Sequence, residues 1–162
     1  MGNLRIRQGN ELDLEAMVAM KSQAWRQSYD FAEEHFQQEA AGQGERIELW
    51  RQLMRDGTHF WVVVDISAKD KIVGLSQASF ARDTDAPNPL ELVLLYLLDE
   101  AKGTGVADAL MKMTLGDAPA HLWMLEDNPR ARAFYHRHGF SWDGTNRDAP
   151  VPGHRDVRLV RP

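Results

Sequence analysis

The feature that most restricts the fold is an apolar run of strand length near the middle of the chain. Residues 90–98 read LELVLLYLL, with one charged side chain among eight apolar ones. A strand this apolar is typical of a central strand covered on both faces. Gly103, Thr104 and Gly105 follow, and residues 106–115 then have the apolar spacing of a helix. The strand, the glycine turn and the helix together predict a mixed α/β fold.

The other periodic segments extend this pattern to both ends of the chain. Apolar runs predict further strands at 4–7, 60–64, 71–80, 122–125 and 157–160. Helical spacing predicts helices at 12–28, at 33–53 with a break at 41–44, and from Asn128 to Gly139. Residues 83–89 and 143–153 are predicted connections because they are rich in turn-forming residues. With no repeat or linker, we expect one domain of the α/β (α+β) class over 1–162.

Composition excludes several classes of function. The chain has no cysteine, so it has no disulfide framework, no thiolate zinc site and no cysteine nucleophile. Nineteen Lys and Arg against 24 Asp and Glu, a net charge of −5, argue against a dedicated nucleic-acid binder. No segment approaches the roughly 18 apolar residues of a membrane span, and the histidines lack a helical His-x-x-x-His pair. We therefore expect a cytoplasmic protein with no membrane partner and no metal.

The glycine turn predicts a site for an anion. Backbone N–H groups at the start of a helix lack intrahelical partners and carry part of a positive charge, so they suit a pyrophosphate. A nucleotide-binding Walker loop is excluded because Lys102 precedes the turn instead of following it. A dinucleotide fingerprint is excluded because Asp108 stands where the third glycine belongs. The remaining alternative is that Gly103 and Gly105 only shape a tight loop.

A second motif begins about twenty residues after the glycine turn. Residues 102–107 read KGTGVA, and residues 128–135 read NPRARAFY, with Gly139-Phe140 shortly after. In this order they resemble the two common motifs of the GNAT family of N-acetyltransferases, Gln/Arg-x-x-Gly-x-Gly/Ala and Asn-x-x-Ala-x-x-Phe-Tyr. The departures are Lys102, in place of Gln or Arg, and Asp99, where many members have proline. Neither change removes a backbone N–H.

The resemblance implies a fold, a reaction and a co-substrate. The fold is a mixed, mostly antiparallel sheet of about six or seven strands flanked by about four helices. The reaction moves an acetyl group directly from acetyl-coenzyme A to a primary amine of a small molecule or peptide. A homodimer is one assembly to expect. The residues implied to bind coenzyme A are Leu97, Leu98, Lys102, Gly103, Thr104, Gly105, Val106, Ala107, Asn128 and Tyr135.

The resemblance also assigns Tyr135 the role of protonating the coenzyme A thiolate as it leaves. Free tyrosine and cysteine-type thiols have pKa values of about 10 and about 8.5, so hydrogen bonding to the sulfur is a large part of that role. The alternative is structural. Ala131, Phe134, Tyr135 and His138 have helical spacing and predict a core-facing stripe. Asn128 likewise has a purely structural alternative as a helix N-cap.

The amine must lose a proton, and Glu91 is the candidate acceptor. It is the only charged residue within an apolar strand, and a carboxyl group buried in such a strand holds a proton more readily than an exposed one. It also matches an acidic residue found early in this strand in related enzymes. The alternative is a glutamate at a strand end beside solvent.

Three further residues are candidates for contact with the amine. Trp25 and Tyr29 lie one helical turn apart and resemble a subset of the family, although core aromatics would show the same spacing. His154 is a second candidate base. Two other functions stay open at this point: a non-catalytic module that binds or senses acyl-coenzyme A, and a structural α/β domain without a ligand.

Overall fold

The computed structural model describes residues 2–30 and 33–162 and divides the chain into two compact units. The first unit comprises residues up to Ala78 together with Leu94–Gly116, and the second comprises Ser79–Val93 and Asp117–Pro162. The strands are β1 (Leu4–Gln8), β2 (Phe60–Asp65), β3 (Lys71–Phe80), β4 (Leu90–Leu97), β5 (Ala120–Leu125), β6 (Ser141–Asp148) and β7 (Arg155–Arg161). The α-helices are α1 (Leu14–Ser28), α2 (Glu33–Ala41), α3 (Gln43–Arg55), α4 (Val106–Leu115) and α5 (Pro129–Arg137).

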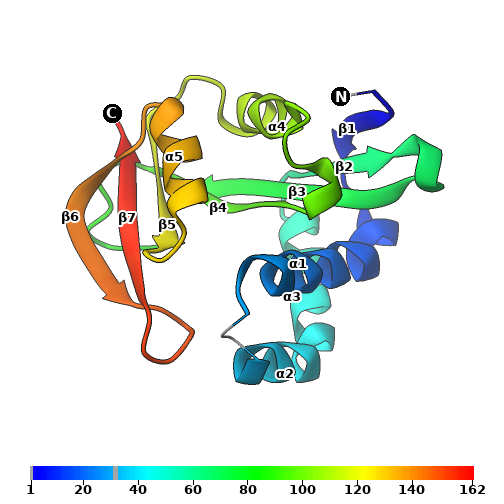
Figure 1. The fold of residues 1–162 in the computed structure, drawn as a ribbon, viewed down its shortest axis with the longest axis horizontal. Helices are drawn as coiled ribbons and strands as arrows, with labels where there is room; N and C mark the ends of the chain where they lie inside the picture. The colour runs from blue at the N-terminus through cyan, green and yellow to red at the C-terminus, as the bar shows by residue number, and fades with distance from the viewer. Residues whose placement is uncertain (1, 31–32) are drawn as a thin grey trace. The chain divides into compact units, whose positions relative to one another are not determined.

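The strands form one seven-stranded sheet in the order β1-β2-β3-β4-β5-β7-β6. In the first unit β1 pairs antiparallel with β2, and β2 pairs antiparallel with β3. Figure 1 shows α1, α2 and α3 on one side of the β2–β3 hairpin and α4 on the other. The inward side chains of β2, including Phe60 and Val62, are fully buried. The ring of Phe60 packs against Trp50 of α3, with the ring centroids 5.2 Å apart, as a sheet packed on helices requires.

In the second unit the sheet contains its one parallel pair among the printed registers. The start of β4 pairs parallel with β5, with Glu91 opposite His121 and Leu92 opposite Leu122. β5 and β6 both pair antiparallel with β7. α5 runs beside these strands (Figure 1). β6 is the edge of the sheet, and seven of its eight residues are exposed.

The structure confirms the predicted fold class and corrects two of its details. Residues 143–153 were predicted to be a connection, but Ser141–Asp148 form β6. The segment reads SWDGTNRD, which is poor in strand-forming residues because an edge strand that is exposed on both faces does not need an apolar side. The predicted helix at 33–53 is two helices, α2 and α3, so the described residues contain five helices. The single domain remains a prediction beside the two units described above.

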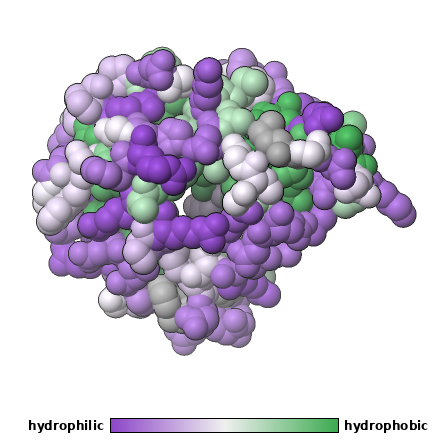
Figure 2. All heavy atoms as spheres, turned by 45° about the horizontal axis from the view of Figure 1, so that its top comes forward, coloured by the Kyte–Doolittle hydropathy of each residue, from purple (hydrophilic) through white to green (hydrophobic). Residues whose placement is uncertain are grey.

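The face drawn in Figure 2 is mainly hydrophilic, with hydrophobic side chains interspersed. Within the described ranges, no helix combines the length and the apolar character that crossing a membrane demands.

Candidate functional site

The glycine turn has the backbone conformation that an anion site needs. Gly103 and Gly105 have φ angles of 75° and 84°, in the left-handed region where a side chain is strained. Gly105 is the N-cap of α4, and as a glycine it supplies no capping side chain. A Cβ atom built on either glycine would meet nothing within 4 Å. The turn is therefore open on its outer side, beside N–H groups that the helix cannot pair.

The other residues of the turn hold it in this shape. Thr104 Oγ1 donates to the Ala101 carbonyl oxygen at 2.6 Å and accepts a long hydrogen bond from the Val106 N–H at 3.4 Å. Lys102 Nζ pairs with Asp99 Oδ1 at 2.6 Å. The two residues that depart from the motif, Asp99 and Lys102, therefore form an ion pair with each other. Val106 is fully buried and anchors the start of α4.

The end of β4 is buried and hydrogen-bonded to β3. Leu97 and Leu98 are both buried. The Leu98 N–H donates to the Val73 carbonyl oxygen at 2.9 Å, so this N–H is used within the protein. Gly74 lies against Leu97, where a Cβ atom would come within 2.6 Å of Leu97 Cδ2.

The second motif forms the start of α5 in the second unit. Asn128 is the N-cap, its side chain accepts from the Ala131 N–H at 3.0 Å, and Pro129 begins the helix. Tyr135 is 9% exposed and makes edge contacts with the rings of Phe134 and Phe140. The expected capping role of Asn128 is confirmed, and Tyr135 is held in a fixed orientation by its aromatic neighbours.

Glu91 is buried and forms an ion pair with Arg82. Its side chain is 1% exposed. Arg82 holds both carboxylate oxygens, with Nη2 2.6 Å from Oε1 and Nε 3.1 Å from Oε2, and the Arg82 N–H adds a bond of 3.2 Å. The alternative of a glutamate beside solvent is therefore wrong. An amine that approaches Glu91 must share its carboxylate with Arg82.

Several polar contacts of residues 81–89 were not predicted from the sequence. His121, on β5, is fully buried, and its Nδ1 lies 2.9 Å from Asn88 Oδ1. Trp123 donates from Nε1 to Asp83 Oδ2 at 2.6 Å. The buried Arg158 reaches Asp85 at 3.3 Å. These contacts hold residues 81–89 against the strands. Their partners lie far apart in the sequence, so local sequence patterns do not reveal them.

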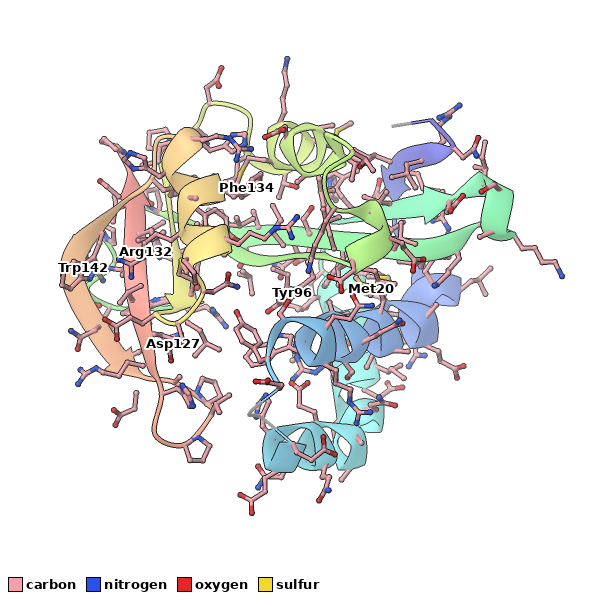
Figure 3. The ribbon with its side chains drawn as sticks, in the orientation of Figure 1. Met20, Tyr96, Asp127, Arg132, Phe134 and Trp142 are labelled. Atoms are coloured by element: carbon pink, nitrogen blue, oxygen red, sulfur yellow. The ribbon has the colours of Figure 1, made fainter. Side chains whose placement is uncertain are left out.

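Trp25 and Tyr29 lie together in the first unit, as their spacing predicts. Their ring centroids are 5.1 Å apart, and Trp25 lies at the same distance from His35. The ammonium of Lys21 lies 5.5 Å from the Trp25 ring and 5.8 Å from the ring of Tyr96, labelled in Figure 3.

Lys21 and Tyr96 were not predicted as part of this cluster. Lys21 is 5% exposed and donates to Glu39 at 3.0 Å; its burial lowers its pKa although Glu39 opposes this. Burial raises the pKa of Tyr96 to about 12, so its hydroxyl keeps its proton at neutral pH. Tyr96 was not predicted because it lies within the apolar run of β4 and was interpreted as a core residue. Lys21 was not predicted because its partner Glu39 is 18 residues away in the sequence.

His154 has a carboxylate partner in the second unit. Its Nδ1 lies 2.8 Å from Asp127 Oδ2, directly before the N-cap of α5. Asp127 was not among the predicted site residues. Throughout residues 2–30 and 33–162, no group of three or more His, Asp or Glu side chains is arranged to hold a metal ion.

Comparisons with known proteins identify the family of the chain. The model of the acetyltransferase (GNAT) family matches residues 18–140. A probable N-acetyltransferase of Mycobacterium tuberculosis is 26% identical over 151 residues, covering 88% of this chain and 82% of that protein.

Solved structures give the same fold. The PaiA N-acetyltransferase of Thermoplasma acidophilum, in complex with coenzyme A, has a TM-score of 0.67 at 18% identity and covers 98% of both chains. A ribosomal-protein-alanine N-acetyltransferase of Brucella melitensis has a TM-score of 0.73 at 17% identity, covering 97% of this chain and 98% of that one. These likenesses concern the fold, and the family model covers most of the chain. The chain belongs to the GNAT family of acetyltransferases.

Proposed function

We propose that this protein transfers an acetyl group from acetyl-coenzyme A to a primary amine of a small molecule or peptide, in the cytoplasm. The observation that carries the proposal is the open glycine turn at the start of α4, where the N-cap residue is a glycine, in a chain of this family. A pyrophosphate at this turn would accept from main-chain N–H groups of Gly103 to Ala107. Glycine at positions 103 and 105 leaves the space in which a phosphate would lie.

The remaining contacts to coenzyme A are assigned by the family motifs. Leu97 and Leu98 would border the pantetheine arm, and Asn128 would contact it through the polar side chain that also caps α5. Lys102 would lie beside the phosphates, released from or shared with Asp99. No metal takes part in this proposal, because thioester acyl transfer to an amine needs only orientation, an oxyanion donor and proton transfers.

The chemistry requires two proton transfers. The neutral amine nitrogen attacks the thioester carbonyl carbon, and the carbon–sulfur bond breaks as the oxyanion collapses. Tyr135 would donate its hydroxyl proton, or a hydrogen bond, to the departing sulfur. Glu91 would accept the proton that the amine loses, through water and in competition with Arg82. His154, oriented by Asp127, is the second candidate for that proton.

The amine is proposed to contact Trp25 and Tyr29. Aromatic faces suit the apolar part of an amine and attract its cationic form before it loses a proton. In the half-buried Trp25–Tyr29 pair, the Trp25 ring also contacts Lys21, which lies against Tyr96 as well. The alternative function, a non-catalytic acyl-coenzyme A module, shares the turn but needs neither Tyr135 nor an amine.

A screen for amine-dependent thiol release tests the proposal. The protein is incubated with acetyl-coenzyme A and each member of a panel of small amines, amino acids, polyamines and peptides, and free thiol is measured. We expect release above the amine-free rate for at least one acceptor class. Binding of coenzyme A without release for any amine would favour the non-catalytic module. Failure of coenzyme A to bind would contradict both.

A further inference from the structure

A groove lies between α5 and the start of β6 in the second unit. Its volume is about 340 Å³, and it is floored by Phe140 and Leu159, which are each 1% exposed. Small-molecule sites typically have volumes of about 300–1,000 Å³, with mostly apolar walls and a few polar groups. The groove therefore has the size and the lining of a site for a small ligand.

The groove uses a face of α5 that the proposed reaction does not use. Pro129, Arg132 and His136 line it and follow one another at i, i+3 and i+7. The stripe that contains Phe134 and Tyr135 lies on a different face of the same helix. No residue assigned above to coenzyme A, to the amine or to proton transfer lines the groove.

Arg132 is the charged group of this groove. It is half-buried, and no side chain in the described ranges pairs with its guanidinium group. Other arginines of this unit hold carboxylates: Arg82 holds Glu91, and Arg158 holds Asp143. A guanidinium group binds a carboxylate through two parallel hydrogen bonds, more strongly where water is partly excluded. Arg132 is thus a vacant partner for an anion.

Trp142 forms the opposite wall. Its side chain is 51% exposed, which is unusual for a large aromatic residue. Its Nε1 donates to the Thr145 carbonyl oxygen at 3.0 Å, so the ring is held at the groove without using its faces. Figure 3 shows Arg132 on α5 and Trp142 on β6. A flat ring against Trp142 would gain apolar burial and ring contacts.

We propose that this groove binds a small aromatic carboxylate, with its carboxylate on Arg132 and its ring against Trp142. Pro129 and the floor residues would cover the other side of the ring. The imidazole of His136 lies beside the anion position on the next helical turn and adds a donor. The site is independent of acetyl transfer, so it is tested by binding alone.

Titration of the isotope-labelled protein with phenylacetate tests the site. We expect chemical-shift changes confined to the amides of α5 and residues 140–142 and to the Trp142 indole. Phenylacetamide, which has the ring without the charge, and acetate, which has the charge without the ring, should each bind about tenfold more weakly or worse. Equal binding of phenylacetamide, changes centred elsewhere, or no binding at millimolar phenylacetate would overturn the proposal.

Variants separate Arg132 from a general charge effect. Arg132→Gln should weaken phenylacetate binding about tenfold, since it removes the charge but keeps a long helix-forming side chain. Arg130→Gln, an exposed arginine of the same helix outside the groove, is the matched control and should bind as the wild type does. Equal loss in both variants, or loss in neither, would overturn the role of Arg132. If Arg132→Gln does not fold, the comparison of phenylacetate with phenylacetamide decides.

Discussion

Gly105 is the residue on which the proposed phosphate site depends most. Its φ of 84° at the start of α4 is a conformation that side chains adopt only with strain. Gly105→Val should therefore weaken coenzyme A binding by about tenfold or more, because the side chain shifts the N–H groups and occupies the ligand's space. Calorimetric titration with coenzyme A measures the effect.

Gly57 supplies the matched control for that change. It also has a positive φ, 98°, with nothing within 4 Å of a Cβ atom. Gly57→Val should lower the free energy of unfolding by a similar amount but leave coenzyme A affinity unchanged. A comparable loss of affinity in both variants would mean that strain alone, not contact with the ligand, explains the result.

A substitution of Tyr135 distinguishes a role in catalysis from a role in binding coenzyme A. Tyr135→Phe keeps the ring contacts with Phe134 and Phe140 and removes only the hydroxyl. Turnover should fall by about a hundredfold, typical of a lost proton donor, while the dissociation constant for coenzyme A changes little. Thiol-release assays measure the turnover, and calorimetry on the same preparation measures the dissociation constant for coenzyme A. Wild-type turnover in the variant would remove the proton-donor role.

Residue identities were readable from the sequence, but their partners were not. The motif placed Gly105, Asn128 and Tyr135 in turns and helices that the structure contains. It gave no sign that Arg82 holds Glu91 or that Val73 uses the Leu98 N–H. Such contacts depend on the path of the chain between the partners, which local spacing does not encode.

At the scale of elements, the start of α1 predicts a pH-dependent stability. Asn10 and Asp13 cap the preceding turn, and Arg7 of β1 holds Asp13 with bonds of 2.7 and 2.9 Å. The hydrogen bond from Arg7 lowers the pKa of Asp13. A lowered folded-state pKa stabilises the fold above the unfolded pKa, about 3.9, and this contribution is lost as pH falls through the folded-state value.

Arg7→Gln should remove this contribution. At neutral pH the variant should be less stable by about 0.5–1 kcal/mol, a modest value because Arg7 is partly exposed. The difference should shrink as the pH falls below about 4, where Asp13 becomes protonated. Arg5→Gln is the control, since among the residues that the structure describes the Arg5 side chain donates to carbonyl oxygens and not to a carboxylate. Thermal unfolding of the wild type and both variants across this pH range measures the effect. A difference in stability between the wild type and Arg7→Gln that does not change with pH would contradict the role of the Arg7–Asp13 pair.

The connection between β3 and β4 gives a second prediction for an element. Arg158 binds Asp143 at 2.7 Å and Asp85 at 3.3 Å from a nearly buried position. Arg158→Gln leaves these carboxylates without their cation and should destabilise the protein by about 2–3 kcal/mol. Hydrogen exchange should rise most at residues 81–89. Unchanged exchange there would show that the other contacts suffice to hold the segment.

Elements were predicted best where one face is apolar. The helix at 106–115 and the hairpin at 60–64 and 71–80 agree with the structure because burial imposes a period on the sequence. The expected number of strands includes β6, but its bounds were not predicted because its exposed residues carry no such period. The break between α2 and α3 was located, but the two helices were joined because both flanks have helical spacing.

For the whole molecule, coenzyme A should act as a stabilising ligand. A ligand at about 100 times its dissociation constant stabilises the native state by about 2.7 kcal/mol. For a chain of this length that corresponds to a rise in Tm of about 5–10 °C. Thermal unfolding with and without coenzyme A measures it, and Gly105→Val should reduce the rise. An unchanged Tm at saturating coenzyme A would speak against a bound co-substrate.

The central claim is that main-chain N–H groups of the glycine turn bind a diphosphate, and calorimetry with two ligands tests it most directly. Coenzyme A and pantetheine share the thiol arm, but only coenzyme A carries the pyrophosphate. The account predicts a clear binding isotherm for coenzyme A and affinity at least about a hundredfold weaker for pantetheine, since the loss removes several charge-assisted hydrogen bonds. Equal affinities, or no heat with coenzyme A, would contradict it.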